Sequence, residues 1–308
     1  MKTKIFLILF VLLLWKAESF AQQKPVFSQY TFNPLAINPA FAGSQEQFSA
    51  TALYRNQWVN LDGAPTTITA SANSGIVGKR IGLGINISND RVGVHNDLGL
   101  YISYAYRIKL NGGAFAMGIQ AGFNNLKSDF TKLNLININD PNLSGIYNKL
   151  NPNFGAGVFY DKGSFYAGFS VPYLINSQFF ADDNVRISDA SSKRYYFLLI
   201  GNLFKITDRF DIKPEVLFRY QEGAPFGADI NGKLILDKKI ALGISYRTGD
   251  AIISTFEFQL NDNLRIGYSY EATLSSLNQF SRGSHEIMIN YRIKIEGLNP
   301  RTDCPTYF

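Results

Sequence analysis

The stretch Leu98–Ile108, LGLYISYAYRI, decides the fold class of this chain. Leucine, isoleucine and tyrosine occupy every second position, and the positions between them are mostly small or polar. A β-strand has this pattern when one face meets apolar material and the other meets water or a polar lumen. The same alternation recurs in Ile81–Ser88 and in Glu286–Ile295. The sequence therefore predicts an all-β protein.

The alternating segments recur along the chain, and there are about fourteen of them, an even number as in bacterial single-chain barrels. Each is about nine to twelve residues long, which suits a tilted membrane strand and is long for a soluble protein. The segments begin near Gln47, Thr66, Lys79, Leu98, Ala114, Asn153, Ser164, Arg194, Phe210, Ala228, Ile240, Ala251, Asn263 and Ser284.

The connections between these segments alternate in length. The short ones, rich in Asn, Asp and Gly as tight hairpins require, are Gly75–Gly78, Asn111–Gly113, Asp161–Gly163, Thr207–Arg209, Asp237–Lys239 and Asn261–Asp262. The others are mostly longer, above all Lys127–Pro152 and Leu174–Lys193, and only Thr248–Asp250 breaks the pattern. Short periplasmic turns and long external loops are typical of outer-membrane barrels. We therefore expect a transmembrane antiparallel up-and-down β-barrel with both chain ends in the periplasm.

The first residues are expected to form a signal peptide. A basic start, the apolar run Ile5–Trp15, and the small residues Ser19 and Ala21 at −3 and −1 of a cut match that pattern. An uncleaved N-terminal anchor is the alternative. No later stretch reaches the roughly 18 apolar residues of a membrane helix, so the sequence argues against helical spans.

Four parts of the chain follow from these patterns. Residues 1–21 are the expected signal peptide, 22–46 an N-terminal periplasmic or plug-like segment, 47–295 the barrel and 296–308 a periplasmic tail. The net charge of +6 comes from scattered Lys and Arg rather than a basic stripe, so a nucleic-acid partner is not expected. The single cysteine, Cys304, cannot form a disulfide within the chain.

The segment before the first strand, Pro25–Gly43, reads PVFSQYTFNPLAINPAFAG. Its two Asn-Pro pairs, Asn33-Pro34 and Asn38-Pro39, favour turns over regular structure. Its aromatic and aliphatic residues are too apolar to remain in water. We expect this segment to pack into or across the periplasmic mouth of the barrel, with a flexible leader as the alternative.

The sequence offers no pattern that predicts a catalytic or metal-binding site. His95 and His285 lack Cys, His and carboxylate neighbours at metal-ligand spacing. Gly82–Gly84 and Gly155–Gly157 resemble phosphate loops but lie inside strands, with no helix to follow. Glycine on the lumen face, making room for neighbours, explains them better. We expect neither an enzyme nor a cofactor.

Aromatic residues gather toward strand ends, as in Tyr195–Phe197, Phe159–Tyr160 and Phe165–Tyr166. Girdles at the two membrane interfaces would explain these clusters. Ordinary β-propensity is the alternative for any single residue.

Three motifs carry a family resemblance. They are FSQYTFNPLAINPAFAGS at Phe27–Ser44, YRNQW at Tyr54–Trp58 and GAPTT at Gly63–Thr67, joined by a closing CPTYF at Cys304–Phe308. Together they resemble the PorP/SprF family of Bacteroidota over essentially the whole mature chain. The resemblance implies an outer-membrane barrel that is associated with the type IX secretion system and with gliding motility. It also implies that some members hold secreted adhesins by their C-terminal domains, while others contact periplasmic lipoproteins or peptidoglycan-binding proteins.

The matching residues are expected to form a plug or a docking surface rather than a catalytic site. Trp and Arg are prominent in protein interfaces when buried. Trp58 as an interfacial anchor and Arg55 as a lumen charge are the alternative. The candidate residues are Phe27, Gln29, Tyr30, Asn33, Pro34, Asn38, Pro39, Arg55, Gln57 and Trp58.

Three functions fit these expectations. The first is a partner-binding barrel of the type IX apparatus, in contact with outer-membrane lipid, a secreted adhesin or cargo C-terminal domain, and periplasmic or lipoprotein components. The second is a transport channel of porin or fatty-acid-channel type, since a fourteen-strand lumen conducts unless something fills it. Its pore-lining candidates are Arg107, Arg247, Arg265, Arg292, Lys233 and Lys294. The third is a soluble periplasmic β-protein.

Overall fold

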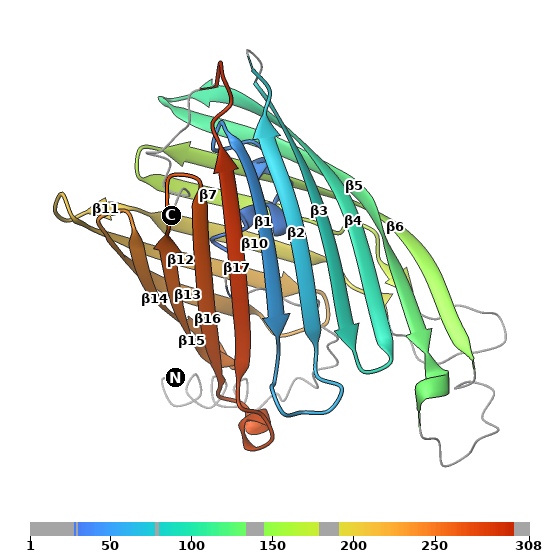
Figure 1. Ribbon diagram of the computed structural model, residues 1–308. Coiled ribbons are helices and arrows are strands. Elements are labelled where there is room, and N and C mark those ends of the chain that lie inside the picture. The colour runs from blue at the N-terminus through green and yellow to red at the C-terminus, as the bar shows by residue number, and fades with distance from the viewer. Residues whose placement is uncertain (1–27, 29, 78–79, 134–144, 179–190, 299–308) are drawn as a thin grey trace, which may run out of the picture.

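The computed structural model describes residues 28, 30–77, 80–133, 145–178 and 191–298. These residues form a closed, fourteen-stranded antiparallel β-barrel (Figure 1). The barrel strands are β1 Phe48–Asn56, β2 Thr66–Gly75, β3 Ile81–Val92, β4 His95–Leu110, β5 Gly113–Asp129, β6 Ile146–Lys162, β7 Phe165–Val171, β10 Tyr195–Asn202, β12 Phe210–Gln221, β13 Gly227–Leu236, β14 Ile240–Arg247, β15 Ala251–Gln259, β16 Leu264–Thr273 and β17 Ser284–Ile293.

Each barrel strand pairs with the next one along the chain, and the last strand closes on the first. β17 pairs with β1 from Phe48↔Ile293 to Asn56↔His285, so the sheet closes on itself. β8 (Ser177–Gln178) and β9 (Ser191–Ser192) form a separate small hairpin in the long connection from β7 to β10. The predicted all-β up-and-down barrel is confirmed.

A proline explains why one strand is divided. β10 and β11 (Phe204–Lys205) both pair with β12, and they do so in one continuous register. Gly201 of β10 lies opposite Glu215, and three residues later Phe204 of β11 lies opposite Ile212. The ladder breaks opposite Pro214, which has no N–H to donate. β10 and β11 are therefore one strand of the barrel, interrupted at that proline.

The predicted strand starts lie within three residues of the observed ones, except at β6. That strand begins at Ile146 rather than near Asn153, because β5 and β6 remain paired as far as Asp129↔Ile146. Pro152 was expected to end the loop Lys127–Pro152. In the structure it lies beyond the last β6–β7 pair, Ala156↔Val171, where β6 is an edge strand and a missing N–H is tolerated.

The loops are sorted between the two ends of the barrel. The turns β2–β3, β4–β5, β6–β7, β11–β12, β13–β14 and β15–β16 are short and share one end. The β1–β2 connection and the short helices η3 (Phe130–Lys132) and η5 (Ser276–Gln279) lie at the opposite end (Figure 1). One expectation was wrong here: the β3–β4 connection is the tight turn Gly93–Val94, where Gly93 takes a φ of +55°. Thr248–Asp250 is therefore not the only short connection at that end.

The two faces of the wall differ in chemistry as the alternation predicts. Outward side chains are apolar, and Ile119 and Ile244 are more than half exposed. Inward side chains are small, polar or charged, and Lys213 and Arg292 are each 1% exposed. No helix in the described ranges is long and apolar enough to span a membrane. The signal-peptide region, Cys304 and most of the C-terminal tail lie outside the described residues.

Candidate functional site

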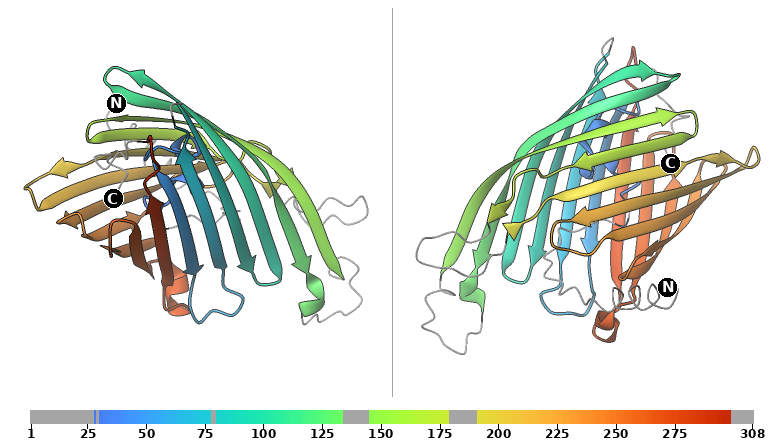
Figure 2. Two further views of the ribbon diagram at one scale, coloured as in Figure 1. Left: turned by 45° about the horizontal axis from the view of Figure 1, so that its top comes forward. Right: turned by 180° about the vertical axis from the view of Figure 1, so that it is seen from behind.

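The N-terminal segment lies inside the barrel. It contains two short 3₁₀ helices, η1 (Pro34–Ala36) and η2 (Pro39–Phe41), and each starts with the proline of an Asn-Pro pair. A proline suits the first helical position because the N–H there has no partner in the helix. At the second pair, the Oδ1 atom of Asn38 accepts a hydrogen bond from the Ala40 N–H at 2.9 Å. Figures 1 and 2 show this segment, in dark blue, enclosed by the strands.

Glycines on the inner wall make room for this segment. A Cβ atom built on Gly82 would lie 1.9 Å from the carbonyl oxygen of Ala42, and one built on Gly118 would lie 2.2 Å from the backbone nitrogen of Ala40. No real Cβ sits that close to such atoms, so only glycine fits. We call the glycines that face the segment on this side of the wall the glycine track: Gly82 and Gly84 of β3, Gly118 of β5 and Gly157 of β6.

Apolar side chains of the segment pack into the wall beside the glycine track. The rings of Phe41 and Phe159 have centroids 4.1 Å apart. The cluster around them also contains inward-facing residues expected at a membrane girdle, namely Tyr166, Tyr195 and Phe197. The girdle interpretation is therefore wrong for these aromatics, because they face the lumen and hold the segment. Tyr160 and Phe165 take the opposite, outward positions on their strands.

Hydrogen bonds attach the polar groups of the segment to the wall. The Asn38 Nδ2 atom donates to the Val158 carbonyl at 3.0 Å. The Ser170 hydroxyl donates to the Ile37 carbonyl at 2.7 Å. The Ser71 hydroxyl donates to Asn33 Oδ1 at 2.9 Å, so both Asn-Pro pairs are tied to strands. Buried polar groups need such partners, because an unpaired one loses the hydrogen bonds it made to water.

A buried ion cluster holds the start of the described segment. The Ser28 backbone N–H donates to Glu286 and its hydroxyl donates to Glu271, both at 2.8 Å. Arg55 pairs with both carboxylates, at 3.0 Å to Glu286 and 3.2 Å to Glu271. Arg247 also pairs with Glu271, at 3.0 Å. We call this group the Arg55 cluster.

The segment runs along the length of the lumen rather than across one mouth. Arg55 is the second-last residue of β1, so Ser28 lies near the long-loop end of the barrel. Gly43 lies against Ser74 and Gly75, at the short-turn end. The segment therefore packs deeper than the mouth position expected from the sequence, and it passes through the lumen before entering β1.

The rest of the lumen holds further paired charges. Lys233 contacts Glu257 at 2.5 Å, and Arg265 contacts the same carboxylate at 3.6 Å. Arg265 also lies over the ring of Phe32 in the segment, 3.7 Å from its centroid. Of the pore-lining candidates, Lys233, Arg247 and Arg265 are buried and paired with carboxylates, and the buried Arg292 donates to the Gln259 Oε1 atom at 2.8 Å. Lys294 is exposed.

The comparisons with known proteins agree with this architecture. The model of the family described as type IX secretion system membrane protein PorP/SprF matches residues 19–291. The chain belongs to this family. No curated protein matches the chain by sequence. The PorP/SprF resemblance stated from the motifs is thereby confirmed, and the residues that fill the barrel all lie inside the matched range.

Solved structures share the fold of this PorP/SprF barrel. The CymD monoaromatic hydrocarbon channel is 11% identical, with a TM-score of 0.55 over 90% of this chain and 95% of that one. The Ralstonia pickettii toluene transporter TbuX is 9% identical, with a TM-score of 0.53 over 85% of this chain and 93% of that one. At such low identity the likeness shows the barrel fold alone.

The candidate residues of this PorP/SprF chain fall into two groups in the structure. Tyr30, Asn33, Pro34, Asn38 and Pro39 come together in the lumen segment, and all but the half-buried Pro34 are buried. Phe27 and Gln29 lie outside the described residues.

The residues of the YRNQW motif lie in two places, the lumen and the β1–β2 loop. Arg55 points into the lumen and is 1% exposed, so it is no docking surface and the lumen-charge alternative describes it. Gln57 and Trp58 belong to the β1–β2 loop, where the backbone N–H of Trp58 donates to the Ser284 hydroxyl at 3.3 Å. That loop also pairs with the β16–β17 connection, through the Val59 N–H and the Gly283 carbonyl.

The residue types that bind metal ions do not gather in the described part of the chain. No group of three or more His, Cys, Asp or Glu side chains there is placed to hold a metal ion. His95 contacts the Ser128 hydroxyl at 2.7 Å, and His285 contacts the Tyr268 hydroxyl at 2.7 Å. The two histidines lie on different strands and neither faces a second histidine.

Proposed function

We propose that this PorP/SprF protein is an outer-membrane component of the type IX secretion and gliding apparatus that binds other proteins rather than conducting solutes. On this proposal it binds secreted surface proteins, periplasmic partners, or both, and it catalyses no reaction. The observation that carries the proposal is the filled lumen. A segment seated in the glycine track and tied to the Arg55 cluster occupies the space that a transport barrel would leave open.

The loop arrangement supports an orientation for this proposal. Short turns of bacterial barrels face the periplasm and long loops face the outside. The β1–β2 and β16–β17 loops, joined through Val59 and Gly283, would then be available to a secreted protein. The short-turn end would be available to periplasmic components.

Planar-bilayer recording and affinity capture together test the proposal. Purified wild-type protein should give a silent membrane, and tagged protein from crosslinked cells should recover a type IX cargo protein or a periplasmic component of the apparatus. A stable open channel would favour transport instead. Crosslinked cells that yield neither class of partner would also count against binding as the function.

A further inference from the structure

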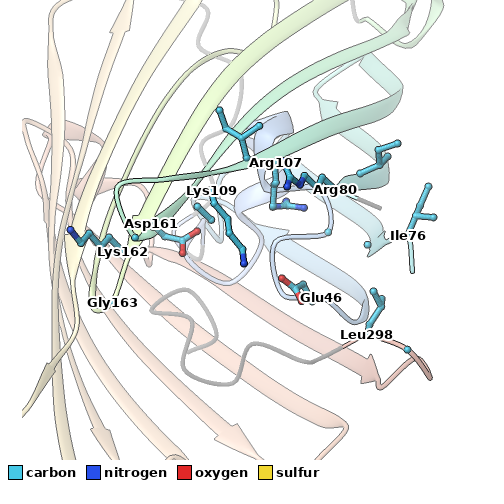
Figure 3. A pocket seen from close by; sticks show the side chains of 17 residues that line it. Glu46, Ile76, Arg80, Arg107, Lys109, Asp161, Lys162, Gly163 and Leu298 are labelled. Carbon is cyan, nitrogen blue, oxygen red and sulfur yellow. The ribbon is translucent and has the colours of Figure 1, made fainter. Parts of the chain in front are cut away.

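A cleft opens at the short-turn end of the barrel, with a volume of about 680 Å³. Its walls come from the turns β2–β3, β4–β5 and β6–β7, from Gly43 and Glu46 at the end of the lumen segment, and from Gly297 and Leu298 after β17 (Figure 3). Parts of the chain that are far apart in sequence therefore build one concave surface. We call it the rim cleft.

The rim cleft has an excess of positive charge. Arg80, Arg107, Lys109 and Lys162 line it, against the carboxylates of Glu46 and Asp161. In Figure 3 the Lys109 ammonium group points into the cleft, whereas Lys162 points away from it. No ion pair joins Arg80 or Lys109 to a carboxylate within the described ranges. Basic groups that remain exposed in a concave site attract an anionic ligand.

Apolar residues border these charges. Ile76, Ile81 and Ile108 line the cleft at the outer side of the barrel wall, and Leu298 lines it from the chain after β17; all four are half-buried. A ligand that fits both features carries carboxylates next to apolar groups, as an acidic peptide segment with interspersed leucine does. Charged side chains at the rim of an interface mainly set the association rate and specificity, while apolar contacts contribute affinity.

The position of the cleft favours a protein over a lipid headgroup. Two of its lining residues, Gly43 and Glu46, belong to the segment that leaves the lumen. Arg107 lies on the inner face of β4 and donates to the Ala42 carbonyl of that segment at 2.5 Å. Arg107 and Lys109 therefore face the lumen mouth, away from the lipid-facing side of the wall, where a headgroup would be held by its acyl chains.

We propose that the rim cleft binds an acidic, leucine-containing segment of a periplasmic protein. This inference rests on the proposed function, which places the short-turn end in the periplasm, and it deepens that function by giving the partner a site and a chemistry. Because Arg107 contacts both the cleft and the lumen segment, a bound partner would lie directly against the plug.

The test uses the full-length protein in nanodiscs and a fluorescent peptide of alternating Glu and Leu. The variant Arg80→Glu/Lys109→Glu should weaken peptide binding at least about tenfold, since two attractive charges become repulsive. The matched control is Lys238→Glu/Lys239→Glu, which reverses two exposed lysines of the β13–β14 turn, away from the cleft, and should leave binding nearly unchanged. The heat-induced shift in gel mobility checks that each barrel is folded.

Several outcomes would overturn the rim cleft proposal. An equal loss of peptide binding in both double variants would show nonspecific charge attraction. Equally strong binding of a peptide of alternating Lys and Leu would show that the cleft does not recognise acidic side chains. Displacement of the peptide by phosphatidylglycerol vesicles would assign the cleft to lipid. Binding only after truncation behind Leu298 would assign it to the chain's own tail. If Arg80→Glu/Lys109→Glu still captures periplasmic partners from cells, the cleft is excluded while the docking function stands.

Discussion

Replacing Gly118 by valine should release the lumen segment while leaving the barrel intact. A Cβ atom at position 118 would lie 2.2 Å from the backbone nitrogen of Ala40 and 2.5 Å from both the Ala40 Cα and the Pro39 carbonyl carbon. All three are backbone atoms, so no side-chain rotation relieves the overlap. Valine is itself well suited to a strand. The overlap therefore acts on the segment rather than on β5.

The displacement is large compared with what the packing tolerates. Ordinary contact begins near 3.4 Å, so the segment around Ala40 must move by more than about 1 Å (3.4 − 2.2). That movement withdraws Phe41 and Ile37, which are 2% and 5% exposed, from their cluster. Burial of such a side chain contributes about 1.5–3 kcal/mol, so the free energy that holds the segment in the lumen falls by roughly 3–6 kcal/mol. The segment should then leave the lumen in a large fraction of molecules.

The assay combines conductance with chemical labelling, in a Cys304→Ser background that carries Ala40→Cys. The Gly118→Val barrel should conduct in planar bilayers and the thiol introduced at position 40 should react with a water-soluble maleimide, whereas without Gly118→Val the barrel should stay silent and unreactive. Gly232→Val on β13 is the matched control, because a Cβ there meets no atom within 4 Å. A Gly118→Val barrel that is folded, silent and unlabelled would refute the reasoning.

Two further predictions concern buried and exposed ion pairs. Arg55→Met should lower the free energy of unfolding, measured by urea in micelles, by about 3–5 kcal/mol, because it leaves buried carboxylates without their cation. Adding Glu286→Gln to Arg55→Met should recover part of that loss. If the double variant instead loses the sum of the two single-variant losses, the pairing is contradicted. At the short-turn end, hydrogen bonds from Arg209 lower the pKa of Asp237 below its usual 3.8. The Arg209–Asp237 pair should therefore stabilise the turn at pH above 3.8, and this stabilisation should be lost as the pH falls through the lowered pKa of Asp237. Arg209→Gln should raise the pH at which NMR finds the Asp237 carboxyl half-titrated.

The architecture of the barrel could be predicted because local chemistry dictates it. Alternation in Leu98–Ile108 sets which side chains meet lipid, and Asn, Asp and Gly mark the tight turns. The β6 start was missed because a proline, Pro152, reads as a loop signal without knowledge of which strand edge is unpaired. The Gly93–Val94 turn was missed because a long connection was expected at that end.

The lumen contents were predicted only in part. The apolar Asn-Pro segment indicated a plug, and glycine at Gly82 and Gly84 indicated close neighbours, but nothing in the sequence joined the two observations. Pairing of Arg55 with Glu271 and Glu286 depends on contacts across more than two hundred residues, which no local pattern shows. A usable signal was available in Phe159, which shares its strand face with Gly157 and therefore faces the lumen.

Disulfide formation between Ala42→Cys and Gly84→Cys, in a Cys304→Ser background, tests most directly whether the segment fills the lumen. The Ala42 Cβ lies 3.3 Å from a Cβ built on Gly84, close to the roughly 3.5–4.5 Å that a disulfide spans. Unlike a Cβ at Gly82 or Gly118, this one is closest to the Leu35 methyl groups, at 2.9 and 3.1 Å, and that side chain can rotate away. We expect mass spectrometry of protein from intact outer membranes to find the two peptides joined, with neither cysteine free to react with maleimide. Two free, readily labelled cysteines in a folded barrel would show that the segment lies elsewhere.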